Sequence, residues 1–222
     1  MNTEHLSRAG QARPTARPRP SEQALLLPER TIGSSDGLLA AGSRRFLISS
    51  SLARLLRREG GVERRVVEGY FPAQKPGRTH FVSVEPGRTE LVLADPDAAD
   101  GEELRTEVPH AHTEALLDLC AGRIGFERTK VWFAADYKIV LERVLHPAIL
   151  DVVTVLAGEG EEPVATPAWF GPEITGDPAW DKRSIALGGA PASPEIPLSN
   201  AALDALLNDL EGRPPGAGRL HG

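Results

Sequence analysis

A strand–helix–strand pattern between Glu103 and Trp132 constrains the fold of this chain more than any other stretch. Apolar and charged side chains alternate over residues 103–108, which is the period-2 pattern of a strand with one polar face. Pro109 ends that strand, a leucine-rich helical stripe follows, and alternation resumes at Ile124. The charged residues on one face of the two strands are Glu103, Arg105, Glu107, Arg128 and Lys130. The pattern predicts a sheet or barrel whose concave side is polar and forms the working surface.

The composition excludes several classes of protein. The chain has 222 residues, of which 41% are hydrophobic and only 5% aromatic, so we expect one domain with an aliphatic core. A formal net charge of −6 argues against specific nucleic-acid binding. Cys120 is the single cysteine and cannot form an internal disulfide. Without an apolar run of membrane-spanning length or a hydrophobic signal core, the expected setting is cytoplasmic, with no membrane.

Three segments are predicted along the chain. Residues 1–40 are rich in Arg and Pro and are predicted to be a disordered leader, because they bury too little apolar surface to offset their ordering entropy. Residues 41–190 form the predicted barrel domain. Residues 191–222 hold a C-terminal helix and tail, with leucines on one face of a helix from Ser199 to Glu211. That face packs against the barrel or, alternatively, binds a protein partner.

About eight strands and two short helices are expected before the C-terminal helix. A helix is predicted from Leu52 to the Gly60–Gly61 pair, and a turn at Pro86–Gly87 joins two strands. Residues 158–197 are Gly- and Pro-rich, and the stretch WFGPEITGDPAW (169–180) within them is predicted to be an irregular loop. The fold class is therefore α+β, an eight-stranded antiparallel β-barrel with short flanking helices.

The order of these segments resembles the CYTH family, also called triphosphate tunnel proteins, over about two thirds of the chain. The matching pieces are RRFLIS, VVEGYF, EVPHAHTEALLDLCAGRIGFERTKVWF and, most specifically, PAWFGPEITGDPAWDKRSIAL. The resemblance implies a closed antiparallel barrel around a polar tunnel. It also implies chemistry on triphosphates, in which inward Lys and Arg hold phosphate oxygens and inward carboxylates hold Mg²⁺ or Mn²⁺.

Most of the carboxylates that this resemblance implies are replaced. Positions where the family carries acidic side chains are occupied by Ala41, Ser43, Val140, Val152 and Thr154. The opening base survives as Arg45, and an Arg-x-Arg pair is replaced by Arg78 and His80. Glu107 is the best retained carboxylate, and the Lys-x-Arg pair is present with its members exchanged.

These substitutions predict a ligand site without a metal. The candidate ligand-binding residues are Arg45, Arg78, His80, Glu107, Arg128, Lys130, Lys138 and Glu142. Charged residues at period 2 are otherwise typical of the solvated face of a sheet, and this alternative stays open. No catalytic residue and no metal ligand is predicted; Mg²⁺ or Mn²⁺ is the alternative cofactor.

Two functions follow from this pattern. The first is a tunnel protein that binds a small anionic, phosphorylated ligand with weak or no triphosphate hydrolysis. The second is an active or repurposed CYTH-type enzyme. It would be either a triphosphate hydrolase with one metal on Glu103, Glu107 and Glu142, or a metal-independent acid/base catalyst using His80 or Glu142.

Overall fold

The computed structural model describes residues 43–60, 64–72, 79–94, 103–133, 138–156 and 166–212. The leader predicted for residues 1–40 lies outside these ranges, as does Arg78. Within them, no helix is long and apolar enough to cross a membrane.

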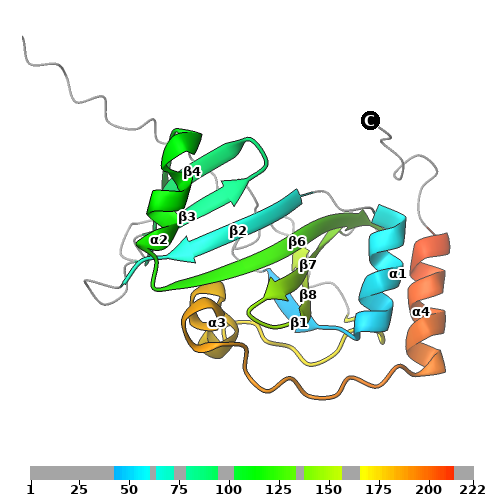
Figure 1. The fold of residues 1–222 in the computed structure, drawn as a ribbon. Coiled ribbons are helices and arrows are strands. Elements are labelled where there is room, and N and C mark those ends of the chain that lie inside the picture. Colours follow the sequence, from blue (N-terminus) through cyan, green and yellow to red (C-terminus); the bar gives the residue numbers. More distant parts are fainter. Residues whose placement is uncertain are drawn as a thin grey trace, which may run out of the picture.

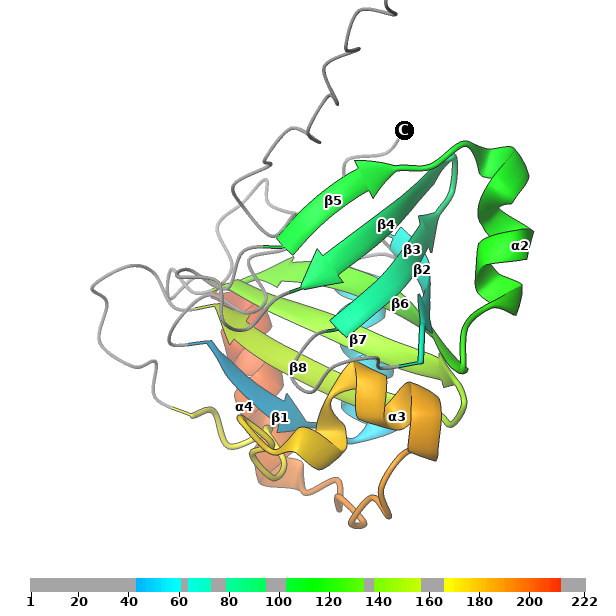
Figure 2. The ribbon, with the colours of Figure 1, turned by 90° about the vertical axis from the view of Figure 1, so that its left-hand side faces the viewer.

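Eight antiparallel strands form one sheet in the order β1-β8-β7-β6-β2-β3-β4-β5. The strands are β1 (Arg44–Leu47), β2 (Arg64–Tyr70), β3 (Thr79–Glu85), β4 (Arg88–Ala94), β5 (Glu103–Glu107), β6 (Gly122–Trp132), β7 (Lys138–His146) and β8 (Leu150–Leu156). Figure 2 shows the sheet curving strongly from β5 at its top to β1 near its bottom. The predicted α+β class and the eight strands are confirmed. No pairing joins β1 to β5 in the described part of the chain, so closure into a barrel is not confirmed.

Local sequence signals explain where several strands begin and end. Gly87 has a φ of 78° in the turn between β3 and β4, a conformation that favours glycine, and Pro86 fixes the preceding position of that turn. Val108 N donates to the carbonyl of Thr89, which extends the β4–β5 ladder up to Pro109. The predicted hairpin and strand end are thus confirmed.

The convex face of the sheet is covered by two helices, α1 (Ser50–Gly60) and α4 (Asn200–Glu211), which lie side by side in Figure 1. Both present an apolar stripe to one core. Its largest members include Leu52, Leu56, Val131, Phe133, Ile139, Leu141, Trp169 and Leu206. Ser199 Oγ accepts from Ala202 N at the start of α4, and Trp169 Nε1 donates to Asp209 at 2.8 Å. This packing accounts for the leucine face of the predicted C-terminal helix; a protein partner for that helix stays a prediction.

The outer edge of β1 is covered by the segment from Phe170 to Thr175. Gly171 N donates to Leu47 O, Leu47 N to Pro172 O, and Ile174 N to Arg45 O. Thr175 Oγ1 accepts from Arg45 N at 2.8 Å. The WFGPEIT stretch therefore satisfies backbone groups that an open sheet edge would leave exposed.

Two short helices lie at the ends of the strands. α2 (Thr113–Asp118) follows the 3₁₀ turn η1 (His110–His112), and α3 (Lys182–Gly188) packs on β6 and β2. The irregular loop predicted for residues 169–180 is confirmed except at the 3₁₀ turn η2 (Pro178–Trp180), and α3, which follows it, was not predicted. This helix has only seven residues and buries only Ile185, so its sequence shows no helical periodicity. A Cβ at Gly122 would lie 2.2 Å from the carbonyl oxygen of Ala186, so glycine permits the close approach of α3 to β6.

A second core lies on the opposite, concave face and fixes α3 to the sheet. It contains Leu47, Val66, Tyr70, Phe81, Val92, Ile124, Phe126, Val144, Leu150, Val152, Ile174, Trp180 and Ile185. Charged residues of the concave face lie two positions from these apolar ones, on the same side of their strands, so they are carried into a largely buried setting.

Candidate functional site

Five side chains from β2, β6, β7 and α3 form a polar cluster on the concave face. We call Glu68, Tyr70, Arg128, Glu142 and Lys182 the central cluster. Strand alternation places Arg128 and Glu142 opposite each other in the β6–β7 register. Arg128 is 2% exposed and Glu142 is 4% exposed, so two opposite charges lie in the protein interior.

Two bases converge on one oxygen of Glu142. Its Oε1 accepts from Arg128 Nη2 at 2.8 Å and from Arg128 Nε at 3.2 Å. Lys182 Nζ lies 2.9 Å from the same oxygen. Burial alone would raise the pKa of Glu142, but Lys182 and Arg128 outweigh burial and lower it to about 2. Glu142 is thus a buried anion held by two cations.

Glu68 and Tyr70 form the second half of the cluster. Tyr70 Oη donates to Glu68 Oε2 at 2.6 Å, and Lys182 Nζ lies 3.6 Å from Glu68 Oε1. Burial raises the pKa of Tyr70 well above its ordinary value, and the charges of Glu68, Glu142 and Glu103 raise it further. The phenol therefore stays protonated and acts as a hydrogen-bond donor at physiological pH.

An aromatic surface adjoins these charges. The ammonium of Lys182 lies 4.1 Å from the ring centroid of Phe126, and the guanidinium of Arg128 lies 5.3 Å from it. Tyr70 and Phe81 stack with ring centroids 5.3 Å apart. The buried Phe126 ring faces both cations, and cation–π attraction is strengthened there by the loss of water.

A second group of alternating charges lies on β4 and β5. We call Arg88, Glu90, Glu103 and Arg105 the β4–β5 cluster. Arg105 donates to Glu103 at 2.5 Å and to Glu90 at 3.2 Å, and Arg88 pairs with Glu90 at 2.6 Å. Burial lowers the pKa of Arg105, but Glu103 and Glu90 more than offset this effect and raise it.

The structure brings together part of the predicted site. Arg128 and Glu142 form the buried pair, and Lys130 lies on the same face of β6, opposite Val140. Arg45 lies on β1 opposite Thr154, and its Nη2 donates to the carbonyl of Trp180 at 3.4 Å, near the start of α3.

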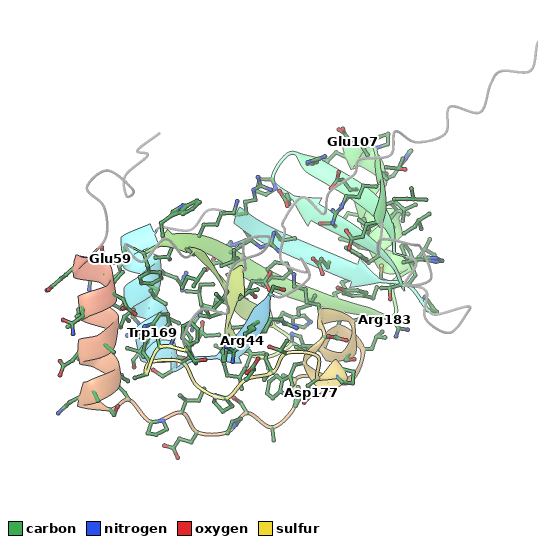
Figure 3. The ribbon with its side chains drawn as sticks, turned by 180° about the vertical axis from the view of Figure 1, so that it is seen from behind. Arg44, Glu59, Glu107, Trp169, Asp177 and Arg183 are labelled. Atoms are coloured by element: carbon green, nitrogen blue, oxygen red, sulfur yellow. The ribbon has the colours of Figure 1, made fainter. Side chains whose placement is uncertain are left out.

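Two of the predicted residues, Glu107 and His80, lie away from the central cluster. Glu107 is exposed at the end of β5, and Figure 3 shows it at the opposite end of the molecule from Asp177. His80 pairs with Leu93 on the face of β3 opposite to Phe81, so it does not join the central cluster. The side chains of Arg78 and Lys138 lie outside the described residues.

Three residues of the central cluster were missed by sequence reasoning. Glu68 and Tyr70 lie in the VVEGYF segment, where alternation with Val67 and Gly69 was a usable signal for a shared face. Lys182 carried no such signal, because its position depends on α3 and on the close contact at Gly122. Only the tertiary fold brings this lysine to Glu142.

The described residues do not fit a metal ion held by carboxylates. No three His, Cys, Asp or Glu side chains within the described ranges gather in an arrangement that could hold a metal. Four concave carboxylates instead accept from bases or from Tyr70, namely Glu68, Glu90, Glu103 and Glu142. Mg²⁺ and Mn²⁺ need several oxygen ligands gathered at one point, and the carboxylates of this face are each directed at a base or a hydroxyl instead.

Comparison with solved structures places the fold. Protein-family models give no match to this chain, and curated proteins give none either. The structure of the hypothetical protein NE1496 matches with a TM-score of 0.51 and 18% identity, covering 70% of this chain and 98% of that one. A second structure, described as the inorganic triphosphatase NE1496, matches with a TM-score of 0.50 and 18% identity, covering 67% of this chain and 95% of that one. A putative adenylate cyclase from Bacillus halodurans matches with a TM-score of 0.41 and 13% identity, covering 52% of this chain and 79% of that one. The likeness to NE1496 extends over nearly all of that protein, and the chain has a CYTH-like fold.

Proposed function

We propose that this chain is a CYTH-like tunnel protein that binds a small anionic, phosphorylated ligand on the concave face of its sheet. The observation that carries the proposal is the convergence of Arg128 and Lys182 on a single carboxylate oxygen, Oε1 of Glu142. Two cations from different elements aimed at one oxygen form the arrangement that holds a phosphate oxygen. Without a ligand, Oε1 of Glu142 occupies the position that a phosphate oxygen would take between Arg128 and Lys182.

The ligand therefore competes with an internal carboxylate. A phosphate has more oxygens and more charge than Glu142, so it can accept from Arg128 and Lys182 together and also from Lys130 and Arg45. Burial strengthens each of these contacts because the local dielectric is low. A tunnel around this ligand belongs to the same proposal, and it does not require β1 to pair with β5, because residues 170–175 already cover the outer edge of β1.

The site supports binding without efficient hydrolysis. Triphosphate hydrolysis of the kind that the resemblance implies needs a divalent cation, and bases engage both Glu103 and Glu142. The likeness to a structure described as an inorganic triphosphatase supports a phosphate-bearing ligand. The cytoplasmic setting expected from the sequence stays a prediction.

A thermal-shift screen of phosphorylated small molecules, run with and without Mg²⁺, tests the proposal. We expect stabilisation by at least one phosphorylated compound in the absence of metal, and loss of that shift in Arg128→Gln. The matched control is Arg123→Gln, which removes an exposed ion pair to Asp118 outside the central cluster. If no phosphorylated compound shifts the parent protein, or if both variants lose the shift equally, anion binding through Arg128 is wrong.

The second candidate function is hydrolysis, favoured by the described activity of NE1496. We expect little or no release of phosphate from tripolyphosphate with Mg²⁺ or Mn²⁺. Robust metal-dependent release that Glu107→Gln abolishes would establish the enzyme and contradict a degenerate site.

A further inference from the structure

We infer that the ligand of the central cluster is a zwitterion, a small phosphorylated compound that carries an ammonium group. This inference rests on the proposed function, because it adds a second recognition element to the same anion site. Two observations carry it. The two cations of the cluster are balanced by two carboxylates, and the ammonium of Lys182 is already bound by those carboxylates.

The cluster already shows how an ammonium group is bound. Lys182 Nζ lies 2.9 Å from Glu142, 3.6 Å from Glu68 and 4.1 Å from the ring centroid of Phe126. Two carboxylates and an aromatic face are the surroundings that recognise alkylammonium ligands. The side chain of Lys182 enters this place from α3, a helix of seven residues, and is 24% exposed.

Charge balance explains why the ligand must bring a cation. When a phosphate accepts from Arg128 and Lys182, Glu142 and Glu68 lose the positive charges that face them. Both carboxylates are buried, and a buried charge without a partner is costly. An ammonium on the ligand occupies the place that Lys182 leaves, so each charge in the site keeps a partner of opposite sign.

Glu68 is the specificity residue in this arrangement. Its Oε2 is fixed by the hydroxyl of Tyr70 at 2.6 Å, while among the described residues Oε1 has only the longer 3.6 Å contact to Lys182. The fixed carboxylate therefore offers one oxygen to an incoming ammonium. The stacked rings of Tyr70 and Phe81 lie beside it and suit the methylene groups that join ammonium to phosphate.

The test compares two matched probes by isothermal titration calorimetry in the presence of EDTA. O-phosphoethanolamine and n-propyl phosphate have the same chain length, and they differ by an ammonium in place of a methyl group. We expect roughly tenfold tighter binding of phosphoethanolamine to the parent protein. In Glu68→Gln the preference for phosphoethanolamine over propyl phosphate should fall to about twofold or less, whatever the change in the affinity for phosphate itself. Arg123→Gln is the control, and it should keep the full preference.

The outcomes separate the inference from the proposed function. Equal binding of the two probes overturns the zwitterion and leaves anion binding intact. Binding of neither probe, with no phosphorylated compound active in the thermal-shift screen, overturns both. If Glu68→Gln fails to fold, Tyr70→Phe releases the Glu68 carboxylate instead; an unchanged preference in that variant contradicts the role of Glu68.

Discussion

Replacing Glu142 by Gln should destabilise the protein strongly, because it removes the anion that the buried Arg128 shares with the partly exposed Lys182. The change keeps the shape of the side chain and its hydrogen-bonding oxygen but leaves Arg128 at 2% exposure without its counter-ion in the cluster. The pKa of Glu142 falls from an ordinary 4.5 to about 2, which corresponds to roughly 3 kcal/mol at neutral pH. Removing one partner of a buried ion pair typically costs about 3–5 kcal/mol, in agreement with that value.

The pH dependence has a definite sign. A carboxyl whose folded-state pKa is lowered stabilises the protein above its unfolded pKa, and this contribution is lost as pH falls. The difference in unfolding free energy between the parent and Glu142→Gln should therefore have its full value at neutral pH. It should shrink as the pH falls from 4.5, the ordinary pKa, to about 2, the pKa in the folded protein. Urea denaturation of both proteins across this range measures the difference.

Glu173→Gln provides the matched control. The pKa of Glu173 is also lowered to about 2, chiefly by hydrogen bonds from Arg44 and Thr175, but this pair lies at the surface. Exposed ion pairs contribute about 0–1 kcal/mol, so the control should lose little stability. A loss below about 1 kcal/mol in Glu142→Gln, or one that does not change with pH, would refute the assignment of Glu142 as a buried counter-ion.

Two further predictions concern the packing that positions the site. Gly122→Ala should cost about 1–3 kcal/mol and weaken phosphate binding, because its Cβ meets the backbone of α3 at 2.2 Å. Gly125→Ala in the same strand, with no atom closer than 4.0 Å, should be nearly neutral by thermal denaturation. Leu206→Ala on α4 should lose about 2–5 kcal/mol because Leu206 is fully buried, whereas Leu207→Ala, at 39% exposure, should lose less than about 1 kcal/mol. Equal losses in the two glycine variants would contradict the packing of α3 on β6, and equal losses in the two leucine variants would contradict the packing of α4.

The strands of this fold are largely readable from the sequence. Alternation between residues 103 and 132, a Pro–Gly turn and a leucine-faced terminal helix each depend on neighbours in the chain, and the structure contains the corresponding elements. α3 was not readable, because it is short and buries a single large side chain. Closure of the barrel was expected from a resemblance, and the described edges β1 and β5 do not pair.

The site was only partly readable for a related reason. Alternation placed Arg128 and Lys130 on one face, and the register of β6 and β7 then set Arg128 opposite Glu142. The sequence suggested an excess of bases on that face, but Glu142 and Glu68 hold Arg128 and Lys182 in ion pairs. The balance of positive and negative charge in the cluster depends on which strands and helices meet in the fold. Local sequence patterns carry no information on those contacts.

Titration of tripolyphosphate into metal-free protein tests the central claim most directly. The parent protein should be compared with Arg128→Gln/Glu142→Gln, which removes both members of the buried pair and so keeps the site's net charge. Replacing both partners avoids leaving a buried charge without a counter-ion, so the double variant should fold. We predict binding to the parent in EDTA and at least roughly tenfold weaker binding to the folded double variant. No binding to the parent, or equal affinity in the two proteins, would contradict an anion site built on Arg128.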